Sequence, residues 1–141
     1  MSDPYHLQRF LDAQSSIYAQ VLAELRDGRK RSHWMWFIFP QIAGLGHSET
    51  ARYYAIGSLD EAAAYLQHSV LGPRLLECTS LVTQVSGKTI HEILGSPDDM
   101  KFRSCMTLFS HAAVDKQPFE EALQKYFAGE KDSLTLECLR P

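Results

Sequence analysis

Residues 3–28, DPYHLQRFLDAQSSIYAQVLAELRDG, contain the clearest fold signal in the chain. Asp3-Pro4 is typical of a helix start, because aspartate caps the first turn and proline at the first helical position loses no hydrogen bond. Apolar residues then recur at intervals of three and four from Leu7 to Leu25, which predicts one amphipathic helix. Gly28 is suited to end this helix, since glycine readily adopts the left-handed conformation found at helix C-termini.

Glycines, prolines and capping residues divide the rest of the chain into segments of helical length. A short helix is expected from Glu49 to Ile56, after the turn that contains Gly44 and Gly46. Ser58 with Glu61, and Thr89 with Glu92, have the spacing of a capping box. The predicted starts of the later helices are Ser58, Gly72-Pro73, Thr89, Ser96-Pro97, Pro118 and Asp132.

The run from Trp34 to Phe39, WMWFIF, is the one serious strand candidate, because it is short, aromatic and followed by Pro40. One strand cannot build a parallel sheet, which needs several strands joined by crossover connections. The sequence therefore predicts a mainly α-helical fold, compact and formed as one domain over residues 1–141. At most a short β element is expected near residues 34–39.

Composition excludes several classes of protein. The 141 residues are 45% hydrophobic and 22% charged, which suits a globular core and not a disordered chain. The longest apolar run is far below the roughly 20 residues that cross a bilayer, so no membrane partner is expected. With no visible secretory signal and three widely separated cysteines, we expect a cytoplasmic protein without disulfides.

The spacing of histidines and cysteines argues against a metal site. There is no C-x-x-C pair, and His91-Glu92 lacks the second histidine of a zinc protease because position 95 is Gly95. Cys78 and Cys105 fall on apolar helix faces, where free cysteines usually only pack. No G-x-S-x-G elbow is present. The sequence thus assigns no metal, no cofactor and no catalytic residue.

The segment 31–48, RSHWMWFIFPQIAGLGHS, is the best candidate for a ligand site. It combines hydrogen-bonding side chains, an aromatic block and a glycine-containing turn, and small-molecule sites need apolar walls with a few oriented polar groups. Lys101 is a second contributor, since a cation near a helix start opposes the helix dipole and needs another justification, such as a ligand anion or a pair with Asp98. The predicted ligand-binding residues are Arg31, His33, Trp34, Trp36, Gln41, Gly44, Gly46 and Lys101.

Two other interpretations of this segment stay open at the level of sequence. In one, Trp34 and Trp36 anchor the core while the glycines only turn the chain. In the other, Arg29, Lys30 and Arg31 contact nucleic-acid phosphates. The net charge of -3 and the shortness of the basic run argue against nucleic acid, because such binding depends heavily on positive charge.

The run Ser32–Gly46, SHWMWFIFPQIAGLG, resembles the signature of a bacterial domain-of-unknown-function family whose members often carry the automatic name calpastatin. LGPRL at 71–75 and SCMTLF at 104–109 also match, so the resemblance covers nearly the whole chain. It implies no established activity. Protease inhibition is rejected, because calpastatin inhibitory segments are largely disordered and repetitive, unlike this chain. A fainter similarity to the YbiA-like or NADAR group implies ADP-ribose and N-glycosidic chemistry.

Two hypotheses of function follow. In the first, a nucleotide or ADP-ribose-like ligand stacks on Trp34 or Trp36, a cation holds its phosphate and Gln41 orients it. N-glycosidic hydrolysis at that site would need an acid such as Glu49 or Glu77. In the second, the chain is a non-enzymatic interaction module or homodimer that uses the aromatic residues between positions 34 and 54.

Overall fold

The computed structural model describes residues 3–140, and within that range it contains ten α-helices and no β-strand. The helices are α1 (Gln8–Gln14), α2 (Tyr18–Arg26), α3 (Met35–Ile38), α4 (Glu49–Tyr53), α5 (Leu59–Gln67), α6 (Leu71–Gln84), α7 (Ile90–Leu94), α8 (Asp98–Ala112), α9 (Gln117–Phe127) and α10 (Ser133–Cys138). The predicted mainly α-helical fold class is confirmed.

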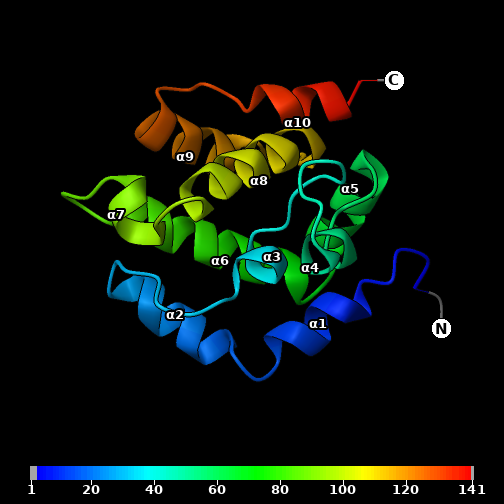
Figure 1. Ribbon diagram of the computed structural model, residues 1–141, viewed down its shortest axis with the longest axis horizontal. Helices are drawn as coiled ribbons and strands as arrows, with labels where there is room; N and C mark the ends of the chain where they lie inside the picture. The colour runs from blue at the N-terminus through cyan, green and yellow to red at the C-terminus, as the bar shows by residue number, and fades with distance from the viewer. Residues whose placement is uncertain (1–2, 141) are drawn as a thin grey trace.

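The two longest helices, α6 and α8, organise the packing (Figure 1). In this view α6 crosses the middle of the molecule, with α1 and α2 on one side and α8, α9 and α10 on the other. Helix α8 packs against α5, α7, α9 and α10, while α2 packs against α6 and α1 against α3. Segments from every part of the chain therefore meet around α8 and α6.

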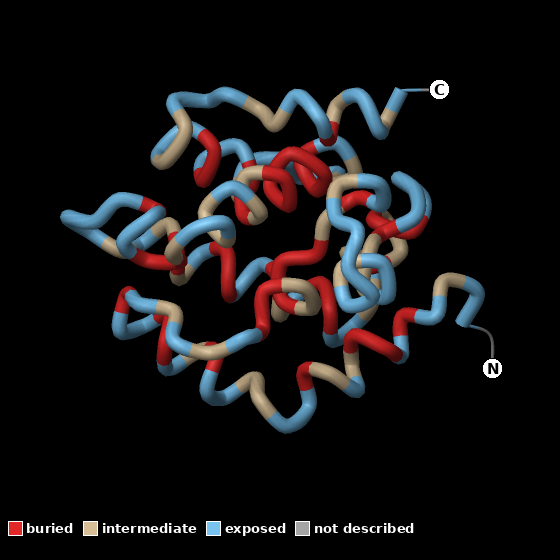
Figure 2. Tube along the Cα trace, viewed as in Figure 1, coloured by how far each residue is buried: buried red, intermediate tan, exposed pale blue. Residues whose placement is uncertain are grey.

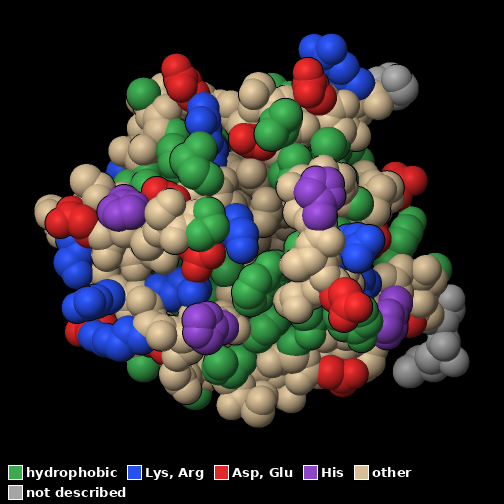
Figure 3. Space-filling view, viewed as in Figure 1, with side chains coloured by type: hydrophobic (Ala, Val, Ile, Leu, Met, Phe, Trp, Pro, Cys, Tyr) green, Lys and Arg blue, Asp and Glu red, His purple; other side chains and the backbone are tan. Residues whose placement is uncertain are grey.

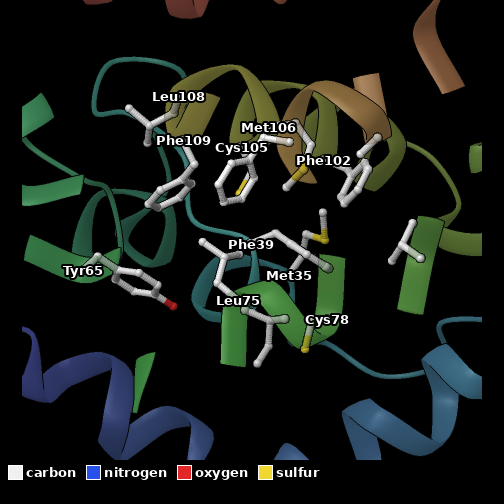
Figure 4. Packing of buried hydrophobic residues seen from close by; sticks show 14 of the residues in the cluster. Met35, Phe39, Tyr65, Leu75, Cys78, Phe102, Cys105, Met106, Leu108 and Phe109 are labelled. Carbon is white, nitrogen blue, oxygen red and sulfur yellow. The ribbon is translucent and has the colours of Figure 1, made fainter. Parts of the chain in front are cut away.

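Helix α8 is buried at Phe102 and then continuously from Ser104 to Ser110, and Figure 2 shows the burial along the tube. Its side chains meet the short aromatic segment before Pro40: the rings of Phe39 and Phe102 lie edge to face with centroids 5.0 Å apart. Figure 4 shows this packing together with Tyr65. The aromatic segment thus forms part of the core.

The first predicted helix is interrupted and forms two helices. The helix begins at Gln8 and not at the predicted Pro4; Asp3 precedes it in the chain and accepts hydrogen bonds from the backbone N–H groups of Leu7 (2.8 Å) and Gln8 (3.0 Å). The break follows Gln14, where two serines favour local side-chain hydrogen bonds over helix continuation. The interruption allows the two helices to pack on different partners, α1 on α3 and α2 on α6. Gly28 follows the end of α2 with φ +72°, as its predicted role requires.

Three predicted capping residues are confirmed. Ser58, Thr89 and Asp132 each accept a hydrogen bond from the backbone N–H three residues later, at the starts of α5, α7 and α10. The helix expected over 49–56 ends earlier, at Tyr53. The backbone N–H of Ile56 instead donates to the Gln41 carbonyl (2.8 Å), which takes it out of the helical pattern.

The strand candidate at residues 34–39 is not a strand, because this segment contains the short helix α3. The N–H of Ile38 donates to Trp34 O (3.2 Å) and that of Phe39 to Met35 O (3.0 Å). No neighbouring strand exists within residues 3–140, where the isolated bridge Ile42–Ile56 is the only β pairing. Across the same range, no helix combines the length and apolarity needed to span a bilayer.

Candidate ligand-binding site

A buried carboxylate fixes the entry to the aromatic segment. Glu24 on α2 accepts hydrogen bonds from the indole N–H of Trp34 (3.0 Å), the hydroxyl of Ser32 (2.6 Å) and the backbone N–H of Arg31 (2.7 Å). Burial raises the pKa of Glu24, but these hydrogen bonds outweigh burial and bring that pKa to about 2. The Glu24 carboxylate therefore stays charged and orients the segment that precedes α3.

The two tryptophans of the segment have different environments. Trp34 is fully buried and points its indole N–H at Glu24, so it belongs to the core. Trp36 is partly exposed and lines a cavity of about 520 Å³. This separation arises because α3 turns the two side chains to different sides, whereas a strand would have placed them on the same face.

The cavity brings together four of the predicted ligand-binding residues: Trp36, Gln41, Gly46 and Lys101. Its volume lies within the range of roughly 300–1,000 Å³ typical of small-molecule sites. The walls come from the loop after Pro40, from α4, from the start of α8 and from the segment that enters α10. Residues far apart in the sequence thus converge on one hollow.

Lys101 lies against the aromatic wall of this cavity. Its ammonium group is 4.6 Å from the centroid of the Trp36 ring, within the range of a cation–π contact. Its distance to the nearer Asp98 oxygen is 3.8 Å, so the pairing predicted as the alternative is present but loose. The Lys101 side chain is 24% exposed, and Lys101 is one of the residues that line the cavity.

Sequence reasoning missed the acidic side of the cavity. Asp132 was predicted only as a helix cap, yet it is the only carboxylate among the cavity-lining residues of the described range. It accepts hydrogen bonds from the Thr135 N–H (2.9 Å) and hydroxyl (2.6 Å). Its own N–H donates to the Thr107 hydroxyl on α8 (2.9 Å). The sequence contained the capping signal, but the approach of α10 to α8 depends on tertiary packing.

Polar and aromatic groups complete the lining. Tyr54 adds a second aromatic side chain, and the polar residues His47, Ser48 and Ser104 also line the cavity. Met100 and Leu134 add apolar surface and remain 46% and 59% exposed. Figure 3 shows the mixed character of this face of the molecule, where apolar side chains are exposed between interspersed acidic and basic ones.

The other predicted residues lie outside the cavity. Arg31 is exposed and pairs with Asp27. Gly44 adopts φ +105° in the turn, and a Cβ there would lie 3.4 Å from the Cys138 sulfur. His33 lines a more open groove of about 510 Å³, with Tyr53, and this groove shares Trp36 and Tyr54 with the cavity. Trp34 is buried in the core, so four of the eight predicted ligand-binding residues line the cavity and four do not.

The two acids considered for hydrolysis also lie elsewhere. Glu77 on α6 accepts a hydrogen bond from the Tyr18 hydroxyl (2.6 Å) and does not line the cavity. Glu49 lines the groove beside His33. No group of three or more His, Cys, Asp or Glu residues suited to a metal ion occurs in the part of the chain that the structure describes.

The comparisons with known proteins identify a family. The family described as "Protein of unknown function (DUF1810)" matches residues 4–139. The chain belongs to this family. No match was found among curated proteins. Neither this family match nor the similar solved structure described next supports the calpastatin name or the fainter similarity to the YbiA-like or NADAR group.

One solved structure is closely similar to this DUF1810 chain. It is the crystal structure of the conserved hypothetical protein Rv1873 from Mycobacterium tuberculosis, with 55% sequence identity and a TM-score of 0.96. The match covers 97% of this chain and 98% of that one. The fold of the DUF1810 chain is therefore shared with that protein over nearly its full length.

Proposed function

We propose that this DUF1810 chain binds a small molecule with a planar ring and polar substituents in the cavity beside Trp36. The observation that carries the proposal is the convergence of Trp36, Gln41, Gly46 and Lys101 on one hollow of suitable volume. Trp36, Gln41 and Gly46 come from one segment and Lys101 from the distant helix α8, and their meeting combines a cation, an amide and an aromatic wall in one cavity.

A nucleotide or an ADP-ribose-like compound fits this set of groups. Trp36 and Tyr54 offer aromatic surface to a base, as in many sites that stack nucleobases. Lys101 supplies a positive charge for a phosphate, and the Gln41 amide can donate and accept hydrogen bonds. The Asp132 carboxylate, on the opposite wall contributed by the α10 entry, accepts hydrogen bonds from ribose hydroxyls.

Binding is tested by calorimetric titration and thermal-shift measurement against nucleosides, nucleotides and ADP-ribose. Trp36→Leu is expected to weaken the ligand that binds by about tenfold or more, because one aromatic stack is lost. Phe127→Leu on α9 is the matched control, since Phe127 is partly exposed and does not line the cavity. No response across the whole panel would contradict the proposal.

Any N-glycosidic hydrolysis in this cavity is proposed to depend on Asp132. Cleavage of a glycosidic bond needs a carboxyl group that stabilises the oxocarbenium-like transition state or activates water, and Asp132 is the carboxylate that lines the cavity. The test is incubation with NAD and nucleosides, with product detection by chromatography. If the Asp132→Asn variant hydrolyses these compounds as fast as the wild type, the Asp132 carboxylate does not take part in the reaction.

Self-association is the second candidate function. The observation that favours it is the exposure of three large apolar side chains around the cavity and the adjoining groove: Tyr53 (52%), Met100 (46%) and Leu134 (59%). Aromatic and methionine side chains are enriched in interfaces. Light scattering at high concentration distinguishes the candidates: a dimer that Tyr53→Ser and Met100→Ser dissociate supports an interface, and a monomer excludes one.

A further inference from the structure

Two lysines share one carboxylate behind the cavity wall. The Lys30 ammonium lies 2.8 Å from Asp98 Oδ2, and Lys101 lies 3.8 Å from the other oxygen, Oδ1. Lys30 follows α2, whereas Asp98 and Lys101 belong to the first turns of α8. The arrangement contains two positive charges and one negative charge, so it retains an excess positive charge.

The two lysines differ in how firmly they are held. The Lys30 side chain is only 8% exposed, its ammonium is 5.1 Å from the Trp34 ring, and its backbone N–H donates to Ile93 O (2.7 Å). It therefore cannot reach the cavity. Lys101 is more exposed, lines the cavity, and sits beyond hydrogen-bond distance of Asp98.

The remaining carboxylate near the cavity does not neutralise this charge. Asp132 accepts hydrogen bonds from Thr135, and no ion pair between Asp132 and Lys101 is formed in the described part of the chain. The Lys101 ammonium is partly buried and only loosely paired with Asp98 at 3.8 Å, which favours an incoming counter-ion because burial removes water from the charge.

We infer that the ligand of this cavity carries an anionic group, a phosphate or carboxylate, that binds Lys101, and that Lys30 positions Lys101 by engaging Asp98. This inference rests on the proposed function and narrows its ligand class to anions. Lys30 occupies Asp98 at hydrogen-bond distance, which leaves Lys101 free to bind the ligand. Without Lys30, Asp98 would take Lys101 as its partner and withdraw it from the cavity.

The test compares adenosine, adenosine 5′-carboxylate and AMP by calorimetric titration. Wild-type protein is expected to bind AMP about tenfold or more tightly than adenosine, since a charge-assisted contact is added. The carboxylate compound shows whether the group must be a phosphate. Lys101→Met is expected to make AMP and adenosine bind equally.

Variants of Lys30 separate positioning from general stability. Lys30→Met is expected to lose most of the preference for AMP, and Lys30→Arg to keep it. The double variant Lys30→Met/Asp98→Asn is expected to restore the preference, because Lys101 no longer has a carboxylate to pair with. A merely structural role of Lys30 would give no such rescue.

The outcomes distinguish this inference from the proposal on which it rests. If adenosine and AMP bind the wild-type protein equally, the cavity binds nucleosides but the anion inference is overturned. If Lys30→Met keeps the full preference, or the double variant fails to restore it while circular dichroism shows it folded, the positioning role is overturned. If none of the three compounds binds and the wider panel of nucleosides, nucleotides and ADP-ribose gives no response either, the proposed function itself fails.

Discussion

Glu24 shows how one buried charge can organise a segment that its sequence neighbours do not explain. The Glu24 carboxylate accepts hydrogen bonds from Ser32, Arg31 and Trp34. It also accepts one from the Gln20 side-chain amide (2.9 Å). The side chain is only 4% exposed, so these hydrogen bonds replace the water it would otherwise bind. The direction in which the chain enters α3 depends on this carboxylate.

Glu24→Gln is expected to lower the free energy of unfolding at pH 7 by about 3 kcal/mol, because an amide has one acceptor oxygen and presents an N–H₂ group to donors. Urea denaturation followed by circular dichroism measures the loss. Glu137→Gln on α10 is the control, since Glu137 is exposed, and it is expected to change the value by less than about 0.5 kcal/mol.

The same carboxylate predicts a pH dependence. The pKa of Glu24 is about 2 in the folded chain against an ordinary value of 4.5, so the unfolded state binds more protons between these values. Its contribution to stability is fully present above pH 4.5 and is lost as the pH falls toward 2. The stability difference between wild type and Glu24→Gln should therefore shrink over that interval. A difference that stayed constant from pH 6 to pH 3 would contradict the low pKa.

At the scale of elements, the sequence predicted helices well where a local signal exists. Ser58, Thr89 and Asp132 mark three helix starts through side-chain contacts made within three residues, so neighbouring residues suffice to find them. Two serines mark the break after Gln14, but the helix at 35–38 depends on which distant surfaces that segment covers. No local pattern contains that information.

The candidate site divides in the same way. Trp36, Gln41 and Gly46 belong to one unusual segment, and Lys101 is conspicuous at a helix start, so sequence reasoning reached all four. Asp132 carries an ordinary capping signal, and only the docking of α10 on α8 places it in the cavity. Trp34 and Trp36 are equivalent in the sequence, and only the helical turn of α3 separates them.

The junction of α5 and α6 requires glycine at position 72. A Cβ on Gly72 would lie 2.0 Å from the Leu66 carbonyl oxygen, a backbone atom that cannot move without shifting α5. Gly72→Ala is therefore expected to cost about 3 kcal/mol of stability, visible as a lowered midpoint of thermal unfolding. Gly87→Ala is the comparison: Gly87 has φ +73° and open space around it, so only about 1 kcal/mol is expected. Equal losses would refute the close contact.

The cavity is a property of the whole molecule, because its walls meet only when the C-terminal segment docks on α8. The Thr107 hydroxyl on α8 accepts a hydrogen bond from the Asp132 N–H (2.9 Å) and donates one to the Arg103 carbonyl oxygen (2.8 Å). This one buried side chain therefore joins the C-terminal segment to α8. The Arg103 guanidinium adds hydrogen bonds to Glu130 O (2.9 Å) and Lys131 O (3.2 Å). These contacts keep Asp132 at the cavity edge.

Thr107→Val keeps the volume but removes the acceptor for Asp132. Amide hydrogen exchange in residues 132–138 is expected to accelerate about fivefold, as one buried hydrogen bond is worth about 1 kcal/mol, while α8 stays protected. AMP binding should weaken in parallel. The control is Thr83→Val, whose hydroxyl donates to Thr79 O on α6 away from the cavity. Unchanged exchange at α10 would show that other contacts suffice.

The bridge between Ile42 and Ile56 has a consequence for how this family could diversify. Two backbone hydrogen bonds, Ala43 N–H to Ile56 O and Ile56 N–H to Gln41 O, both 2.8 Å, close the ends of the segment 43–55 on each other. Loops with adjacent ends tolerate changes of length at little cost to the rest of a fold. This segment supplies one wall of the cavity, and the helices that bear the core do not pass through it. Changes of length or sequence within 43–55 would therefore reshape one wall of the cavity, while Trp36, Gln41 and Lys101, which lie outside this segment, keep their places.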